Sequence, residues 1–352
     1  MGLWSASPTN FAKGQIISKR WKVKQKLGEG GFGAVYKVLD LETKNNAALK
    51  VEEKRKHGVL KLEAMILRTL GDIPYFPHLL DSGKKSTYSY IVITLLGPSL
   101  NKILKFFGRV CSISTQVRIG INTLYALKQL HDIGFLHRDL KPGNVAVGPV
   151  GTPEFRFIHI FDFGLARRFI ITQSGQKPPK MRRPRPRVHF RGTLRYCSIN
   201  CHEKGEQGRD DDLWCFFYML VELRGRLPWS NVREGLGILE MKRTVDVEEL
   251  LKDCPVEFIS IEQHLKSLNY YLRPDYALIY RLLMQVMNAG NFKFTDPYDW
   301  ELKSSIPAPS STDETASSEG STLRTAKTPA SGPSLWYNPF PAEFFDTNPL
   351  GF

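Results

Sequence analysis

The first hundred residues alternate between apolar and polar positions in a pattern that predicts β-strands. From Trp21 to Leu27 apolar residues recur among polar ones, which is typical of a strand with one buried face. This strand runs into a glycine cluster at 28–33. Further strands are predicted at 34–38, 47–51 and 88–94.

Helical patterns begin inside this region and dominate after Gly97. Residues 58–70 place apolar side chains at near-helical spacing, and residues 115–133 carry a long apolar face. Residues 213–223 are almost wholly apolar and predict a buried helix. The fold class is therefore α+β, with a small β-rich lobe of about 21–96 that holds one main helix, and a larger, mostly helical lobe of about 97–301.

The two ends of the chain have a different character. Residues 1–20 are polar and irregular and predict an N-terminal extension. Residues 302–352 form a tail, rich in Ser, Thr, Pro and Ala up to about Ser334, which buries too little apolar surface to offset its ordering entropy. The stretch 335–352 is aromatic and Pro-rich. It could dock on the domain or on a partner, but a mostly disordered end is the favoured expectation.

Composition and charge indicate the size of the domain, the location of the protein in the cell and the kind of partner that it binds. With 352 residues, of which 42% are hydrophobic, the chain can form one large two-lobed domain. Five dispersed cysteines indicate reduced thiols, and no apolar run approaches the ~18–20 residues of a membrane span. We expect a cytoplasmic monomer without a membrane partner. The net charge of +14 predicts an acidic partner.

The glycine cluster and the strands after it predict a nucleotide site. Gly28, Gly30 and Gly33 form G-x-G-x-x-G, and a strand follows them instead of the helix of a dinucleotide fold. The loop is thus expected to be a hairpin lid over phosphates. Lys50 lies inside an apolar strand, where its charge needs a partner, and Glu63 on the next helix is the predicted one.

The segment 137–144, His-Arg-Asp-Leu-Lys-Pro-Gly-Asn, carries the strongest chemical signal. Asp139 suits the acceptance of a hydroxyl proton, and Lys141 can place a positive charge beside the γ-phosphate. Asn144 suits a metal site, and Asp162 of Asp-Phe-Gly suits the Mg²⁺ that bridges two phosphates. These residues together predict phosphoryl transfer from ATP with Mg²⁺ as cofactor.

The motifs occur in the order and spacing of the protein-kinase signature set, so the chain resembles a eukaryotic protein kinase. Lys141 resembles the serine/threonine branch. The segment 192–200, Gly-Thr-Leu-Arg-Tyr-Cys-Ser-Ile-Asn, is similar to a motif of the casein kinase 1 group. Within that group, residues 21–301 look most like the tau-tubulin kinase family, on segments such as 134–139, 211–214, 217–222, 227–229 and 296–301.

The resemblance also implies roles for further residues. It places Val35, Ile93 and Leu96 around the nucleotide, with Ile93 where the family usually has methionine. It implies that Asp212 anchors the catalytic loop and that activation needs no loop phosphorylation. Arg195 matches an arginine of the group's anion-binding site, in which Lys242 or Arg243 could also take part.

Between Gly164 and Tyr196 there are ten Lys and Arg residues and no acidic residue. We expect an anion site for acidic or already phosphorylated protein substrates, because arginine binds phosphate and carboxylate in a two-pronged fashion. Its predicted residues are Arg185, Arg187, Arg191 and Arg195. A solvated loop, or a nuclear import signal at 180–187, are the alternatives. A nucleic-acid partner is not expected, because the run lacks interleaved aromatic residues.

The sequence therefore predicts a serine/threonine protein kinase for acidic or primed proteins. Two rivals stay open at this point. One is a pseudokinase that binds without turnover, which the presence of Lys50, Glu63, Asp139, Asn144 and Asp162 disfavours. The other is a nucleotide-binding regulator that phosphorylates only its own Ser/Thr-rich tail.

Overall fold

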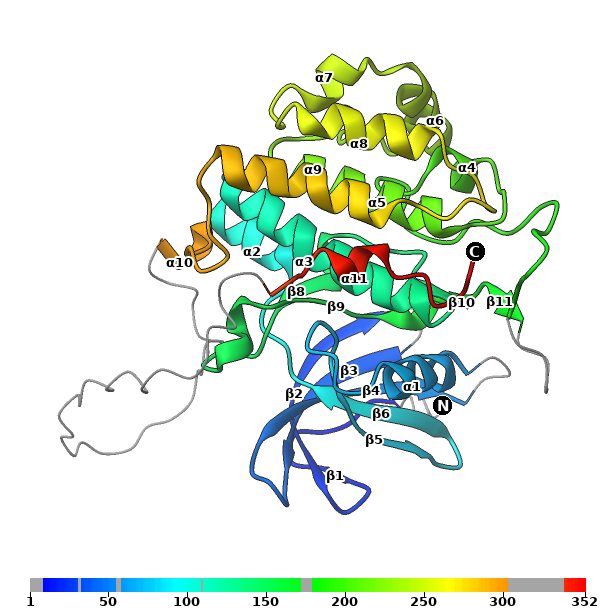
Figure 1. Ribbon diagram of the computed structural model, residues 1–352. Helices are drawn as coiled ribbons and strands as arrows, with labels where there is room; N and C mark the ends of the chain where they lie inside the picture. Colours follow the sequence, from blue (N-terminus) through cyan, green and yellow to red (C-terminus); the bar gives the residue numbers. More distant parts are fainter. Residues whose placement is uncertain (1–8, 31–32, 55–57, 109, 172–178, 303–338) are drawn as a thin grey trace.

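The structure, a computed structural model, describes residues 9–30, 33–54, 58–108, 110–171, 179–302 and 339–352. The predicted two-lobed α+β fold is confirmed: a curled sheet with one helix forms the smaller lobe, and helices form most of the larger one (Figure 1). The expected disorder of 303–334 lies outside the described residues.

The smaller lobe is built on one antiparallel sheet with the strand order β1-β2-β3-β4-β6-β5. Trp21, Tyr36, Val38 and Leu49 on its inner face are buried and form the core of this lobe. The sequence pattern missed β5, because its Leu-Leu-Asp-Ser-Gly-Lys does not alternate. The strands are β1 Ile16–Ile17, β2 Trp21–Gly30, β3 Gly33–Asp40, β4 Asn46–Glu53, β5 Leu79–Lys84 and β6 Tyr88–Thr94.

Helix α1, Val59–Leu70, packs against this sheet and against the segment that follows Asp162. It buries Leu60, Glu63 and Ala64 among other residues, and it ends at Gly71, whose N–H bonds to the carbonyl of Leu67. Glu63 is therefore a buried carboxylate on a helix that touches both lobes.

The larger lobe surrounds helix α3, whose predicted apolar face is buried in the main core. Its N-terminus is capped by Ser112, whose hydroxyl accepts from the N–H of Thr115. The predicted buried helix is α5, which contacts α3. The helices are α2 Leu100–Phe107, α3 Ile113–Asp132, α4 Ile199–His202, α5 Arg209–Glu222, α6 Gly235–Thr244, α7 Val247–Leu251, α8 Glu257–Lys266, α9 Tyr276–Ala289 and α10 Asp299–Leu302.

Short strands carry the loops that face the smaller lobe. β8 pairs with β9, β7 with β10, and β11 with β12, all antiparallel. These six strands are β7 Phe135–Leu136, β8 Val145–Val147, β9 Ile158–Ile160, β10 Arg167–Arg168, β11 Ile170–Ile171 and β12 Lys180–Met181. Single 3₁₀ turns cover Pro142–Asn144, Pro153–Arg156 and Phe163–Leu165.

The described part of the predicted N-terminal extension belongs to the smaller lobe. Ile16 and Ile17 pair with β2, and the buried Phe11 packs on Tyr36 at a ring-centroid distance of 5.4 Å. Residues 9–20 are therefore less irregular than expected, because the buried Phe11 and Ile17 anchor this segment to the sheet.

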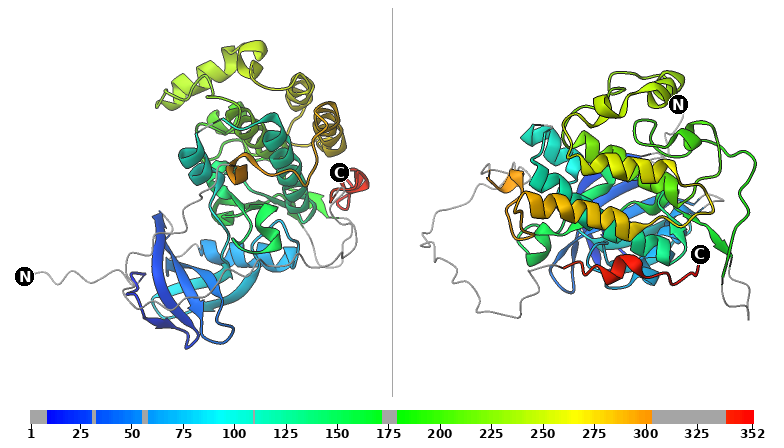
Figure 2. Two further views of the ribbon diagram at one scale, coloured as in Figure 1. Left: turned by 90° about the vertical axis from the view of Figure 1, so that its left-hand side faces the viewer. Right: turned by 45° about the horizontal axis from the view of Figure 1, so that its top comes forward.

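The last residues differ from the disorder favoured for the tail. Residues 339–352 pack on the outside of the larger lobe and include helix α11, Glu343–Asp346 (Figure 2). Phe340 and Phe345 are buried, and Phe345 stacks on Tyr280 at 4.2 Å. Docking on the domain is what the structure shows for this stretch. None of the described helices has both the length and the apolar character of a membrane span.

Candidate active site

A lysine and two carboxylates meet between the lobes, as the sequence predicted for Lys50 and Glu63. The Nζ of Lys50 on β4 lies 2.8 Å from Oε2 of Glu63 and 2.6 Å from Oδ1 of Asp162. Phe163 is buried beside α1 and packs against the rings of Phe76 and His137. This packing directs Asp162 toward the lysine, and the left-handed backbone of Asp162, φ 68°, completes the turn.

The charges of this group depend on one another. Burial disfavours the ammonium of Lys50, but Glu63 and Asp162 outweigh it and raise the pKa of Lys50. Burial likewise opposes ionisation of Asp162, yet Lys50 holds the pKa of that carboxyl below its usual value. Burial raises the pKa of the Glu63 carboxyl, against the attraction of Lys50. Lys50 is thus a fixed cation, and Asp162, whose side chain is 42% exposed, is an anion that still faces solvent.

Asp139 lies at the centre of a second cluster in the catalytic loop. Its Oδ1 accepts from the hydroxyl of Thr193 at 2.6 Å, and its Oδ2 accepts from Nζ of Lys141 at 2.7 Å. Lys141 also donates to the Thr193 hydroxyl at 2.9 Å. The amide nitrogen of Asn144 donates to the backbone carbonyl of Asp139 at 2.9 Å. Lys141 and Asn144, both predicted for the catalytic loop, therefore contact Asp139, and Asn144 also reaches its Oδ2 at 3.3 Å.

The buried helix α5 holds this loop in place, as the resemblance implied for Asp212. The carboxylate of Asp212 accepts the backbone N–H groups of His137 and Arg138, both at 2.7 Å. His131 lies 3.0 Å from the same carboxylate and contacts the hydroxyl of Tyr276. Burial would raise the pKa of Asp212, but His131 and the loop N–H groups lower it. The anchor is therefore charged.

The glycine-rich segment forms a hairpin lid, not the start of a helix. Gly28 pairs with Val35, and Gly30 pairs with Gly33, across β2 and β3. A Cβ at Gly28 or Gly30 would meet no atom within 4 Å, so the space beside these glycines can admit phosphate oxygens. Gly33, with φ 142°, passes so close to β4 that a Cβ would lie 1.9 Å from the carbonyl oxygen of Val51.

The connection between the lobes offers polar backbone groups for a base. Ile93 on β6 and Leu96 just beyond it are half-buried. The N–H of Gly97 bonds to the carbonyls of Val147 and Gly148, whereas the N–H of Leu96 bonds to no other residue in the described part of the chain. Leu96 can therefore donate to adenine, as the resemblance implied.

The donor set fits a hard divalent cation shared with phosphates. Asp162 supplies a partly exposed carboxylate, and the nitrogen of Asn144 is engaged by Asp139, which leaves the amide oxygen as a ligand. In the described segments no three His, Cys, Asp or Glu side chains gather into a metal cage. Mg²⁺ prefers such a site, with one or two protein oxygens and the rest from water and phosphate.

The comparisons with known proteins agree with this geometry. A family model described as "Protein kinase domain" matches residues 21–275. The chain belongs to the protein kinase family. A Caenorhabditis elegans protein whose name describes a serine/threonine-protein kinase is 46% identical over 345 residues, or 96% of each chain. A Dictyostelium discoideum protein with a similar name is 36% identical over 301 residues, which are 85% of this chain and 60% of that protein.

Two of the basic residues predicted for the substrate site have acidic partners in this kinase, and two have none among the described residues. Arg185 is bound by both oxygens of Glu206, at 2.5 and 3.0 Å. Arg195 is bound by Glu222 at 2.8 Å. Arg187 and Arg191 are exposed and make no ion pair with another described residue. Two of the four arginines predicted for the anion site, Arg185 and Arg195, are therefore paired with acidic residues that come after the segment.

Sequence reasoning missed two residues that order the activation segment. Thr193 bonds both Asp139 and Lys141, and Glu206 binds Arg185 and also Arg167, whose Nε lies 3.1 Å away. Thr193 lies within the quoted motif 192–200, so its position was a usable signal. Glu206 lies in a polar turn before α5, and nothing in the sequence around it indicates a structural role. That role depends on Arg185 and Arg167, about 20 and 40 residues earlier.

Proposed function

We propose that this protein is a serine/threonine kinase of the casein kinase 1 group, most similar to the tau-tubulin kinase family, that phosphorylates acidic or primed proteins with Mg·ATP. One observation supports the proposal more than any other: Lys50 is paired with Glu63 and Asp162, and Asp139 is held by Lys141 and Thr193. A binding scaffold without turnover has no need for this complete set.

Different residues of the chain have different roles in the reaction. Lys50, held by Glu63, positions the α- and β-phosphates, and Asp139 accepts the proton of the attacking hydroxyl. Lys141 neutralises charge beside Asp139, at 2.7 Å. Mg²⁺ held by Asp162 and Asn144 would supply the charge that stabilises the phosphate oxygens. The hairpin at Gly28 and Gly30 covers the nucleotide and keeps water from it.

The subgroup assignment has support in the contacts of its signature segment. Ser198 caps α4 and donates its hydroxyl to Asp211, which stands at the start of α5. Asn200 donates to the other oxygen of Asp211 at 3.1 Å. Asp211 also accepts the N–H of Gly208. In this way Ser198 and Asn200 connect the end of the activation segment to the helix that anchors the catalytic loop.

A preference for acidic substrates has support in a basic pocket beside the catalytic loop. The pocket, of about 270 Å³, is lined by Lys105 of α2, Arg195 and Arg226, and also by Pro142. Arg195 is engaged by Glu222, but Lys105 and Arg226 are exposed and pair with no described acidic residue. Pro142 lies three residues after Asp139, so a carboxylate or phosphate held here would belong to the same peptide as the accepting hydroxyl.

The test is a comparison of peptides with and without acidic residues near the phosphorylated serine. The double variant K105E/R226E is expected to raise KM roughly tenfold for acidic or primed peptides, because it reverses the charge of the pocket. KM for neutral peptides and KM for ATP are expected to stay unchanged. The variant K22E/K24E, with the same charge change on the exposed face of β2, is the control. Equal changes for acidic and neutral peptides would contradict the substrate preference.

A further inference from the structure

Three of the five cysteines gather around Lys242 in the larger lobe, next to the end of the activation segment. Cys197 directly precedes the cap of helix α4, Cys201 lies within α4, and Cys215 lies on α5. All three are buried free thiols. None of the roles assigned above uses them.

Cys197 and Cys201 are in direct contact. They are separated by the first turn of α4, in which the capping hydroxyl of Ser198 accepts the N–H of Cys201 at 3.0 Å. The thiol of Cys201 is hydrogen-bonded to the sulfur of Cys197. The two sulfurs can therefore join without a rearrangement of distant segments.

The ammonium of Lys242 is buried beside this pair. Its Nζ donates to the carbonyls of Leu194 and Cys197, at 2.9 and 2.5 Å, and lies 3.3 Å from Nε2 of His202. Burial lowers the pKa of Lys242 to about 8, against the attraction of the three cysteines. Among the described residues no carboxylate pairs with this lysine. Because a buried cation without an anion is costly, this place favours a thiolate.

The two thiols hold their protons unequally. The hydrogen bond from Cys201 lowers the pKa of the Cys197 thiol. His202 and Lys242 lower it further, although burial opposes ionisation. The pKa of Cys201 is raised by Cys197 and by burial, so Cys201 keeps its proton. Cys197 is thus a nucleophilic thiolate with a second thiol beside it, the arrangement from which disulfides form.

We propose that Cys197 and Cys201 form a reversible disulfide when the protein meets hydrogen peroxide, and that this bond slows phosphoryl transfer. A small oxidant is required, because each of the two residues is only 2% exposed. The half-buried His202, which hydrogen-bonds to Cys197, places this sulfur close to the surface.

The oxidation proceeds in two steps. The thiolate sulfur of Cys197 attacks one oxygen of the peroxide, so an S–O bond forms, the O–O bond breaks, and hydroxide leaves and takes up the proton that the Cys197 thiol had released. The sulfur of Cys201 then attacks the sulfenic sulfur, so the S–S bond forms and the oxygen leaves as water with the proton of Cys201. In total, two thiols lose two electrons and one peroxide is reduced to two water molecules.

The disulfide would act on catalysis through Thr193. The N–H of Cys197 donates to the carbonyl of Thr193 at 3.1 Å, and Sγ of Cys201 lies 3.2 Å from the carbonyl oxygen of Arg191. These two contacts support the turn that presents the Thr193 hydroxyl to the catalytic carboxylate. Joining the sulfurs draws Cys197 and Cys201 together and disturbs both contacts. This effect rests on the proposed kinase function, whereas formation of the disulfide does not.

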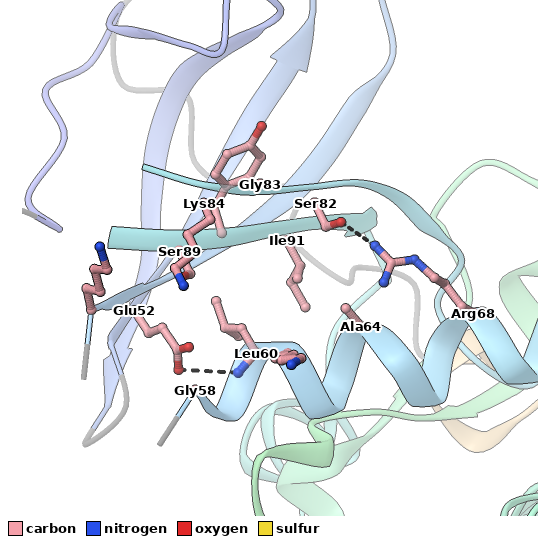
Figure 3. Close-up of a pocket in the computed structure, with 13 residues that line it drawn as sticks. Glu52, Gly58, Leu60, Ala64, Arg68, Ser82, Gly83, Lys84, Ser89 and Ile91 are labelled. Atoms are coloured by element: carbon pink, nitrogen blue, oxygen red, sulfur yellow. Dashed lines mark hydrogen bonds between the residues drawn. The ribbon is translucent and has the colours of Figure 1, made fainter. Parts of the chain in front are cut away.

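The smaller lobe offers no competing site for this chemistry, because it contains no cysteine. Its pocket between α1 and the edge formed by β5 and β6, for example, is lined by side chains without a thiol (Figure 3). Peroxide is therefore expected to leave the pairing of Lys50 with Glu63, and with it KM for ATP, unchanged.

The experiment treats the reduced full chain with hydrogen peroxide, blocks the remaining thiols with iodoacetamide and analyses the tryptic peptides by mass spectrometry. Cleavage after Arg195 and Lys204 releases residues 196–204, which contain both cysteines. This peptide is expected to lose the mass of two hydrogen atoms and to escape alkylation. In the same samples, kcat for an acidic serine peptide is expected to fall roughly tenfold or more, because Thr193 is displaced. Dithiothreitol is expected to reverse both changes.

Two variants locate the effect, each compared with itself before and after peroxide so that any effect of the substitution on the reduced protein cancels. C197S removes the nucleophile and is expected to keep its rate after peroxide. C215S, which replaces the neighbouring buried cysteine, is the matched control and is expected to be inhibited as the wild type is.

Four results would overturn the proposal. They are an unchanged mass of the wild-type peptide 196–204, a disulfide that includes Cys215, equal inhibition of the wild type and C197S, and a disulfide that leaves the rate of an active kinase unchanged. A reduced protein without any kinase activity would refute the proposed function instead, and the mass of the peptide would still test the disulfide.

Discussion

Thr193 donates its hydroxyl to Oδ1 of Asp139 at 2.6 Å, although 54 residues separate them in the sequence. The same hydroxyl accepts from Lys141 at 2.9 Å. Thr193 thus fixes the orientation of the carboxylate and the lysine together, and it ties the activation segment to the catalytic loop.

We expect T193V to lower kcat roughly tenfold to a hundredfold, the usual effect of losing a hydrogen bond to a charged group. KM for ATP is expected to stay the same, because Thr193 does not line the nucleotide site. T193S, which keeps the hydroxyl, is the control and is expected to recover most of the rate. Equal rates for T193V and T193S would contradict the role assigned to the Thr193 hydroxyl.

Glu206 is a buried acidic residue that pairs with two arginines of the activation segment. Its buried carboxylate binds Arg185 and Arg167. Burial opposes its ionisation, but Arg185 and Arg167 lower the pKa of Glu206 below its usual value. Glu206 is thus a fixed internal anion for two arginines of the segment, the kind of partner that a phosphate group would otherwise supply.

The variant E206Q keeps the shape of Glu206 and removes its charge. We expect kcat/KM for a protein substrate to fall several-fold while KM for ATP is unchanged, since the two arginines lose their shared anion. E203Q is the matched control, because Glu203 forms an exposed pair with Arg243, and exposed pairs contribute little. A normal kcat/KM for E206Q would contradict this role.

The closing segment of the chain stabilises the larger lobe. Phe345 is fully buried and stacks on Tyr280, and the hydroxyl of Tyr280 donates to the carbonyl of Phe340 at 2.6 Å. F345A is expected to cost about 3–5 kcal/mol of unfolding free energy, the usual range for truncating a buried phenylalanine. F344A, which removes a 41% exposed ring one residue away, is expected to cost much less. The midpoint of thermal unfolding distinguishes the two, and equal midpoints would mean that α11 does not dock in solution.

Burial of His159 predicts a pH dependence of stability. Its surroundings on β9 disfavour the charged ring and lower the pKa of His159 to about 4, while Nδ1 contacts the carbonyl of Phe157 at 3.1 Å. At pH values between about 6.5, the ordinary pKa of histidine, and about 4, the pKa of His159 in the folded protein, the unfolded chain binds a proton that the folded chain does not. Stability therefore falls as pH decreases through this window, by about 3 kcal/mol in all.

Unfolding by urea at pH 7.5 and at pH 4.5 measures this effect. The variant H159Q has no group that titrates at this position. Its loss of stability between the two pH values is therefore expected to be smaller than that of the wild type by most of the about 3 kcal/mol. The same loss in both proteins would assign the pH dependence to other groups.

Local pattern and motif spacing were sufficient to predict the two lobes and the pairing of Lys50 with Glu63. Lys50, Asp139 and Asp162 occur in short segments whose residue types are dictated by phosphate and metal chemistry, so no knowledge of distant contacts was needed. The same holds for α3 and α5, whose apolar faces follow directly from their place in the core.

The features that escaped prediction depend on contacts between distant segments. Arg185 and Arg195 looked available for substrate because Glu206 and Glu222, which neutralise them, come 21 and 27 residues later. The edge strand β5 has no alternation of its own and exists through its pairing with β6. Residues 339–352 are ordered because aromatic pockets on α3 and α9 receive Phe340 and Phe345.

The most direct test of the account is the rate at which the purified full chain transfers labelled phosphate from ATP, with Mg²⁺, to an acidic serine peptide. Wild-type protein is predicted to turn over, and D139N is predicted to lose about 10²-fold or more in kcat while it still binds nucleotide. Because Asp139 is held by Thr193, Lys141 and Asn144, the isosteric amide should leave the fold intact. A D139N rate close to that of the wild type would contradict the central claim that this carboxylate accepts the proton of the attacking hydroxyl.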